Sequence, residues 1–97
     1  MNIYKSLNEI TEYIDKNLEE EIIYEVLAKM LGVNVYTMQR LFTMIAGISV
    51  SEYIRKRRLS SAGYDLYEGN LKVIDVAVKY QYDNATSFSR AFEKFHG

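Results

Sequence analysis

VLAKMLGVN at residues 26–34 and DVAVKYQYD at residues 75–83 are the stretches that decide the fold, because each repeats the other. Aligning them places Ala28 on Ala77. After the turn that follows, RLFTMIAG at residues 40–47 matches RAFEKFHG at residues 90–97. Each copy contains a short helix with a small residue, a tight turn near Gly32 or Gln81, and a longer helix. That layout predicts a helix-turn-helix unit, present twice.

Helical periodicity fills the rest of the chain. A first helix is expected from Ile3 to about Asn17, because apolar residues recur there at steps of three and four. The next apolar segment runs from Ile22 to Gly32, and Asn34 then caps a helix that ends at Gly47. A capping box at Ser49–Glu52 opens a long helix over residues 50–68. Two more helices are expected at about 73–80 and 85–95, the last capped by Asp83 or Asn84.

The predicted fold class is therefore all-α, with about six to seven helices and no sustained strand alternation. A chain of 97 residues forms one domain, here 1–97. Within it we expect a first helix-turn-helix unit at about 1–47, a linker helix at about 50–68 and a second unit at about 71–97. The absence of proline agrees with a chain that is helical nearly throughout.

Composition excludes several classes of function. Without cysteine the chain has no disulfide, thiolate metal site or cysteine nucleophile, and its single histidine, His96, cannot build a histidine metal site or a Ser-His-Asp triad. No apolar run approaches the ~18 residues of a membrane span, and the start has no signal-peptide core. We therefore expect no enzyme activity, no cofactor, no metal and no membrane partner.

The two longer helices of the repeat each have a polar outer face. The first is expected to bury Met38, Leu41, Phe42 and Ile45, and the second Phe88, Ala91, Phe92 and Phe95. The outer faces then carry Tyr36, Gln39, Arg40 and Thr43, and Thr86, Ser89, Arg90 and Glu93. Glutamine and arginine read adenine and guanine edges bidentately. Any amphipathic helix has a polar face, but an arginine at the same place in both copies favours DNA reading.

Taken together, these motifs resemble the DNA-binding domain of the AraC/XylS family of bacterial transcription regulators, over nearly the whole chain. The matching stretches, in order, are Leu27-Ala28, Gly32-Val33-Asn34, Gln39-Arg40-Leu41-Phe42, Gly47, Ser49 to Tyr53, Arg57-Arg58-Leu59, Ala62, Val76-Ala77, Tyr82, Phe88-Ser89-Arg90-Ala91-Phe92 and Gly97. The resemblance implies a homeodomain-like fold whose central helix holds two recognition helices in successive major grooves of double-stranded DNA.

The resemblance also implies the contacts. Base contacts are expected from Tyr36, Gln39, Arg40, Ala85, Thr86, Ser89 and Arg90. Phosphate contacts are expected from Asn34, Thr43 and Lys94. Partners outside the chain would be an effector-binding or dimerisation domain, with RNA polymerase as a further candidate. The implied setting is the bacterial cytoplasm, at the nucleoid when bound to DNA. We expect the chain to be the amino-terminal domain of a longer regulator, or a cut piece of one.

The sequence departs from the family pattern in three ways. Gln81 stands where the family usually has a turn glycine, and Glu93 stands where it commonly has a basic residue. The first helix of each unit lacks the usual Ser or Thr cap and has Ile23 or Lys72 there. These departures predict that the first unit reads sequence while the second is more a backbone clamp.

Several other features favour structural roles. The run Arg55-Lys56-Arg57-Arg58 spreads around a helix, so we expect a solvated, partly ion-paired face with one or two arginines near DNA or in salt bridges. Most of the nine tyrosines and the four methionines are expected in the core, with Tyr36 the exception, and His96 at the surface.

Charge leaves a second class of function open. The net charge is −1, which suits a helical protein-interaction module that has kept the fold and lost DNA affinity. The charge is unevenly distributed, however. Residues 1–30 hold three basic and seven acidic residues, a net −4, whereas residues 31–97 hold nine basic and six acidic ones, a net +3. The helices expected to meet DNA are therefore mildly basic.

Overall fold

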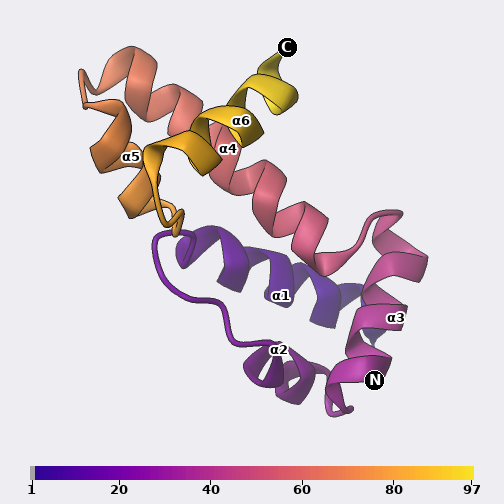
Figure 1. Cartoon of the computed structure of the whole chain (residues 1–97). Coiled ribbons are helices and arrows are strands. Elements are labelled where there is room, and N and C mark those ends of the chain that lie inside the picture. The colour runs from indigo at the N-terminus through magenta and orange to yellow at the C-terminus, as the bar shows by residue number, and fades with distance from the viewer. Residues whose placement is uncertain (1) are drawn as a thin grey trace. The chain divides into compact units, whose positions relative to one another are not determined.

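The computed structural model describes residues 2–97, and that range contains helices and no strands (Figure 1). Its six helices are α1 (Ile3–Lys16), α2 (Tyr24–Leu31), α3 (Val35–Ala46), α4 (Val50–Glu68), α5 (Val73–Lys79) and α6 (Ala85–His96). The all-α prediction is confirmed, with six helices. The long helix predicted over residues 50–68 occupies those residues.

The chain forms two compact units. One contains residues 2–17 together with Ile22–Ile54, and the other contains Leu18–Glu21 together with Arg55–Gly97. Helix α4 begins in the first unit and continues in the second. This helix contributes buried residues to each unit, Val50 and Ile54 to the first and Leu59 and Ala62 to the second.

The first unit is built around apolar side chains of α1, α2 and α3. The small side chain of Ala28, 3% exposed, lets α2 and α3 approach closely. At the start of α4 the ring of Tyr53 packs edge-on against Phe42, with centroids 5.8 Å apart, and its hydroxyl donates to the Asp15 carboxylate at 3.1 Å. The buried residues of this unit are Leu7, Ile10, Ile14, Leu27, Ala28, Leu31, Met38, Phe42, Val50 and Ile54.

The second unit has a row of aromatic rings along α6, of which Phe88 is buried whereas Phe92 and Phe95 are only half-buried. Phe88 is 1% exposed, and its ring lies 5.4 Å from that of Tyr82 and 5.5 Å from that of Phe92. The other buried residues are Leu18, Leu59, Ala62, Val76, Ala77 and Tyr80. Ala77 of α5 corresponds to Ala28 of α2, since each is the small residue in the first helix of a helix-turn-helix. The core of each unit thus follows the repeat read from the sequence.

Some side chains expected in the core lie outside it. Ile45, in the last turn of α3, is 37% exposed, and Met44, which lies one turn after Arg40 on the outer face of that helix, is 70% exposed. Among the tyrosines, Tyr64 and Tyr67 of α4 are exposed, as is Tyr4 of α1. The expectation that the methionines are core residues is therefore wrong for Met44, and for Met1 it lies outside the described residues. The expectation for the tyrosines is wrong for these three.

Helix ends follow the available caps. Asn2, Asn34 and Asn84 each accept a hydrogen bond from a backbone N–H of the first turn they precede. Helix α2 has no such side chain, and it begins at Tyr24, two residues later than the apolar run. Ser49 caps α4 by accepting from the Glu52 N–H at 3.1 Å, as the capping box predicted.

Candidate nucleic-acid interface

The turns of the two units have the same hydrogen bonds. In the first unit Gly32 donates to Lys29 O at 3.1 Å and Val33 to Ala28 O at 3.2 Å. In the second, Gln81 donates to Val78 O at 3.2 Å and Tyr82 to Ala77 O at 2.9 Å. These paired bonds form a Schellman motif, which needs a left-handed residue after the helix. Helices α2 and α5 therefore end in the same backbone motif.

The left-handed position is glycine in one unit and glutamine in the other. Gly32 has φ +71° and Gln81 has φ +73°. Gln81 therefore adopts the left-handed conformation that favours glycine. Its side chain supplies a compensation, because Nε2 donates to the Glu19 carbonyl at 2.8 Å. That bond offsets a backbone cost of about 1 kcal/mol.

Side chains of the second unit also hold the segment Leu18–Glu21, which precedes α2, by hydrogen bonds. Arg58 of α4 donates from Nε to Leu18 O at 2.9 Å and from Nη2 to Glu20 O at 2.7 Å. With Gln81 on Glu19 O, three successive carbonyls of Leu18–Glu21 accept side-chain hydrogen bonds. Arg58, from the densest charge run, thus has a structural role.

The exposed face of α3 gathers four of the predicted DNA-contacting residues. Tyr36, Gln39, Arg40 and Thr43 line a hollow of about 450 Å³, together with Met44. Tyr36 is 66% exposed. Sequence reasoning missed Met44, because it assigned every methionine to the core. The face therefore combines polar side chains with two exposed apolar surfaces, the tyrosine ring and the methionine.

Arg40 and Tyr36 contact each other across one helical turn. The guanidinium carbon of Arg40 lies 5.6 Å from the centroid of the Tyr36 ring, within the range of a cation–π interaction. Its Nη1 also donates to the Tyr36 hydroxyl at 3.4 Å, a long hydrogen bond. The ring contact is therefore the main interaction between them.

The two polar residues predicted to hold phosphates on α3 already make local hydrogen bonds. Asn34 Oδ1 accepts from the Thr37 N–H at 2.8 Å, which leaves its amide NH₂ as the donor for a phosphate. Thr43 donates its hydroxyl proton to Gln39 O at 2.9 Å, so a phosphate contact requires that bond to be exchanged.

Helix α6 presents the second predicted set. Thr86, Ser89, Arg90 and Lys94 are all exposed, and Ala85 is half-buried at the first position of the helix. Glu93 is exposed among them. Asn84 caps the helix by accepting from the Ser87 N–H at 2.8 Å, the bond that Asn34 makes in α3. The structure thus leaves every predicted polar contact residue of α6 accessible.

His96 is the last residue of α6. It is exposed, as expected, and its ring packs against Phe92, with centroids 4.2 Å apart. Its Nε2 lies 3.3 Å from Leu59 O of α4. A Cβ added at Gly63 would come within 3.1 Å of that nitrogen, so a larger residue there would require the His96 ring to shift by a few tenths of an ångström.

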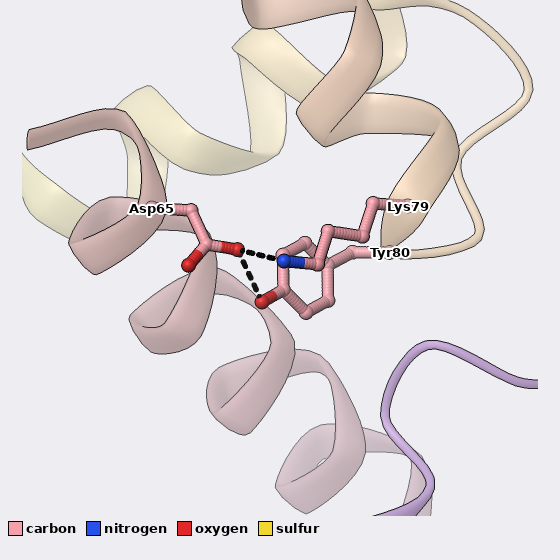
Figure 2. Close-up of polar contacts among 3 residues, drawn as sticks. All are labelled: Asp65, Lys79 and Tyr80. Atoms are coloured by element: carbon pink, nitrogen blue, oxygen red, sulfur yellow. Dashed lines mark hydrogen bonds and ion pairs between the residues drawn. The ribbon is translucent and has the colours of Figure 1, made fainter. Parts of the chain in front are cut away.

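A polar cluster joins α5 to α4 within the second unit. Figure 2 shows the Asp65 carboxylate facing the ends of Lys79 and Tyr80. Asp65 Oδ2 accepts from Lys79 Nζ at 2.7 Å and from the Tyr80 hydroxyl at 2.6 Å. This cluster positions the first helix of the unit, and neither periodicity nor motif spacing pointed to it.

The cluster shifts the pKa of each member. Burial raises the pKa of Asp65, but the hydrogen bonds from Lys79 and Tyr80 and the lysine charge outweigh it, so the net change is downward. The bond to Asp65 raises the pKa of Lys79. Burial, followed by the bond and charge of Asp65, raises the pKa of Tyr80. All three shifts favour the charge states in which the hydrogen bonds exist.

Membrane spans and metal clusters are both absent from residues 2–97. No described helix is long and apolar enough to cross a membrane. The described side chains contain no group of three or more His, Cys, Asp or Glu placed to hold a metal ion.

Comparisons with known proteins identify the class. A family profile described as a helix-turn-helix domain matches residues 27–97. The transcriptional activator AarP of Providencia stuartii is 37% identical over 91 residues, covering 94% of this chain and 67% of that protein. Across AarP and two further curated relatives, the chain spans between 63% and 74% of their length.

Solved structures have the same fold. An AraC-type transcriptional regulator from Chromobacterium violaceum superposes with a TM-score of 0.87 at 22% identity, covering 96% of this chain and 83% of that one. The DNA-binding domain of AdpA, solved in complex with a target DNA, gives a TM-score of 0.84 at 21% identity, covering 95% and 83%. The fold and the matched residues define a helix-turn-helix regulator. This chain belongs to the AraC-type family of DNA-binding transcription regulators.

Proposed function

We propose that this chain binds double-stranded DNA sequence-specifically and so regulates bacterial transcription, with α3 and α6 entering successive major grooves. One observation carries the proposal. The same Schellman turn and asparagine cap precede two helices whose exposed faces each carry an arginine, Arg40 and Arg90. A repeated helix-turn-helix suits successive grooves, whose centres are about 34 Å apart.

The proposed contacts divide by chemistry. Gln39 and Arg40 offer the bidentate side chains that distinguish adenine and guanine edges, and Arg90 offers a third. Tyr36, Thr86 and Ser89 complete the base contacts, and Ala85 would meet a thymine methyl group. Asn34, Thr43 and Lys94 would hold phosphates, which fix the register without reading sequence.

The two units have different tasks in this proposal. On α3, Gln39 and Arg40 lie in one hollow with Tyr36, which concentrates base-reading groups. On α6, the exposed Glu93 lies among Ser89, Arg90 and Lys94, and its charge opposes phosphate binding. We therefore assign sequence reading mainly to the first unit and backbone clamping to the second.

Selection of bound sequences from a random duplex pool tests this assignment. The expected product is an asymmetric site that spans about two helical turns. Arg40→Ala should relax base preference in one half of that site, by about 1–3 kcal/mol per lost contact. Arg90→Ala should lower affinity about equally for all sequences. A loss confined to one base pair with Arg90→Ala contradicts the clamp, and no enrichment with the wild-type chain contradicts the proposal as a whole.

A second candidate function is a protein-interaction module of the same fold. It is favoured by exposed apolar side chains in the second unit, including Tyr64, Tyr67 and Val78. A salt titration separates the two functions, because counterion release predicts that log K falls with log salt by about 0.9 per neutralised phosphate. Weak, salt-insensitive duplex binding would favour the interaction module.

The wider setting belongs to the same proposal. We propose as its protein partners a second domain, for effector binding or dimerisation, and RNA polymerase. The proposed location is the bacterial cytoplasm, and the proposed role is non-enzymatic.

A further inference from the structure

The contact between Tyr36 and Arg40 has a use beyond local stability. We infer that the Tyr36 ring positions the Arg40 guanidinium for reading a guanine, and so determines specificity at that base pair. The inference rests on the proposed function. It gives Tyr36 a role that is separate from any base contact of its own.

An exposed arginine has many rotamers, and a bidentate contact with guanine requires one. Each rotamer lost on binding weakens the complex, whereas a side chain already held in place loses less. In α3 the ring of Tyr36 lies one turn before Arg40, with 5.6 Å between the guanidinium carbon and the ring centroid. The free protein therefore already restricts the arginine.

The contact leaves the base-reading donors available. It uses Nη1, which points to the Tyr36 hydroxyl at 3.4 Å. Nε and Nη2 remain as a parallel pair of donors, the arrangement that guanine O6 and N7 accept. Arg40 also lines the open hollow on α3, so DNA can approach it.

The second unit provides an internal comparison. Thr86 and Arg90 occupy the positions of Tyr36 and Arg40 in the repeat, and threonine has no ring for a guanidinium to stack on. Arg90 is therefore not held in the same way. This difference agrees with a first unit that reads sequence and a second that clamps the backbone.

A double-mutant cycle on the selected duplex tests the inference. The proteins are the wild-type chain, Tyr36→Ala, Arg40→Ala and the double variant, each measured against the selected site and against that site with its Arg40-dependent guanine changed to adenine. Tyr36→Ala should lower discrimination at this base pair about two- to fivefold, the range that an exposed cation–π contact implies. In the Arg40→Ala background the same change should have no effect there.

Two further variants serve as matched controls. Tyr36→Phe keeps the ring and should retain most of the discrimination. Tyr64→Ala removes another exposed tyrosine and should change nothing at this base pair. Thermal unfolding should show that Tyr36→Ala stays folded, since its side chain is exposed.

Three results would overturn the inference: equal losses with and without Arg40, a loss confined to another base pair, or a Tyr36→Phe loss as large as that of Tyr36→Ala. Failure of the proposed function gives a different result. In that case the wild-type chain would select no sequence, or Arg40→Ala would leave every base preference unchanged.

Discussion

At the scale of single residues, Gln81 shows how an unfavourable backbone conformation is tolerated. Its φ of +73° is normally a glycine conformation, and its side chain bonds the Glu19 carbonyl at 2.8 Å. Gln81→Ala keeps the strain and loses the bond, so it should lower the free energy of unfolding by about 1 kcal/mol. Gln81→Gly loses the same bond but relieves the strain, and should recover about 1 kcal/mol relative to alanine.

Urea unfolding of the three proteins measures both effects. The expected order of stability places wild type and Gln81→Gly close together, with Gln81→Ala below them. An alanine variant as stable as wild type would show that the side-chain bond contributes nothing. A glycine variant less stable than the alanine variant would show that the left-handed conformation carries no strain.

Residues whose role depends on local sequence could be predicted, and those whose role depends on distant packing could not. Asn34 and Asn84 were predictable caps, because capping depends on the residues that directly follow. The partners of Asp65 were not predictable. They lie 14 and 15 residues further along the chain. The exposure of Met44, by contrast, could have been predicted from helical period, because it lies one turn after Arg40 on the outer face of α3.

At the scale of helices, the cluster of Asp65, Lys79 and Tyr80 ties α5 to α4 and should make stability depend on pH. The lowered pKa of Asp65 stabilises the fold above its ordinary value of 3.8, and this contribution is lost as the pH falls through the folded pKa. The raised pKa of Tyr80 stabilises the fold below its ordinary value of 10.0, and that contribution is lost as the pH rises.

Tyr80→Phe isolates this contribution. At pH 7 it should lower the free energy of unfolding by about 1–2 kcal/mol, because it removes a hydrogen bond to a charged group. The difference from wild type should shrink as the pH falls below 3.8 and as it rises above 10, because Asp65 is then protonated, or Tyr80 ionised, in the unfolded chain before it is in the folded one. Tyr64→Phe, at an exposed tyrosine next to Asp65 in α4, should show no such dependence. A Tyr80→Phe cost that is constant with pH would contradict the role of the cluster.

Helix α6 carries its own electrostatic prediction. Glu93 is exposed on the proposed DNA-binding helix, where a carboxylate repels phosphates. Glu93→Lys should therefore raise affinity for duplexes of any sequence and steepen the slope of log K against log salt by about 0.9.

Glu9→Lys makes the same charge change at an exposed position of α1, outside the proposed contact set, and should leave the slope nearly unchanged. Equal effects of the two substitutions would mean that net charge alone, and not the face of α6, sets the affinity.

Most helix boundaries could be predicted, because period, caps and glycines are local signals. The start of α2 was less certain, since Ile23 offers no side-chain cap and the helix begins at Tyr24. The position of Leu18 in the core of the second unit could not be predicted either. It continues the apolar period of α1, yet it lies beyond the helix and is buried in the second unit.

At the scale of the whole molecule, the net charge of −1 is the sum of an acidic first part and a basic second part of the sequence. Residues 1–30 carry a net −4 and residues 31–97 a net +3, so the proposed recognition helices lie in the basic part of the sequence. A charge of this size gives only modest non-specific attraction to DNA. Base contacts must therefore supply much of the binding free energy, which makes α3 and its hollow the decisive surface.

The two units are proposed to bind successive major grooves of one duplex. Inserting five base pairs between the halves of the selected site tests this most directly, because the insertion turns one half by about half a helical turn relative to the other. If both units bind, affinity should fall by about tenfold or more, toward that of a single unit. Unchanged affinity for the lengthened site would contradict binding by both units.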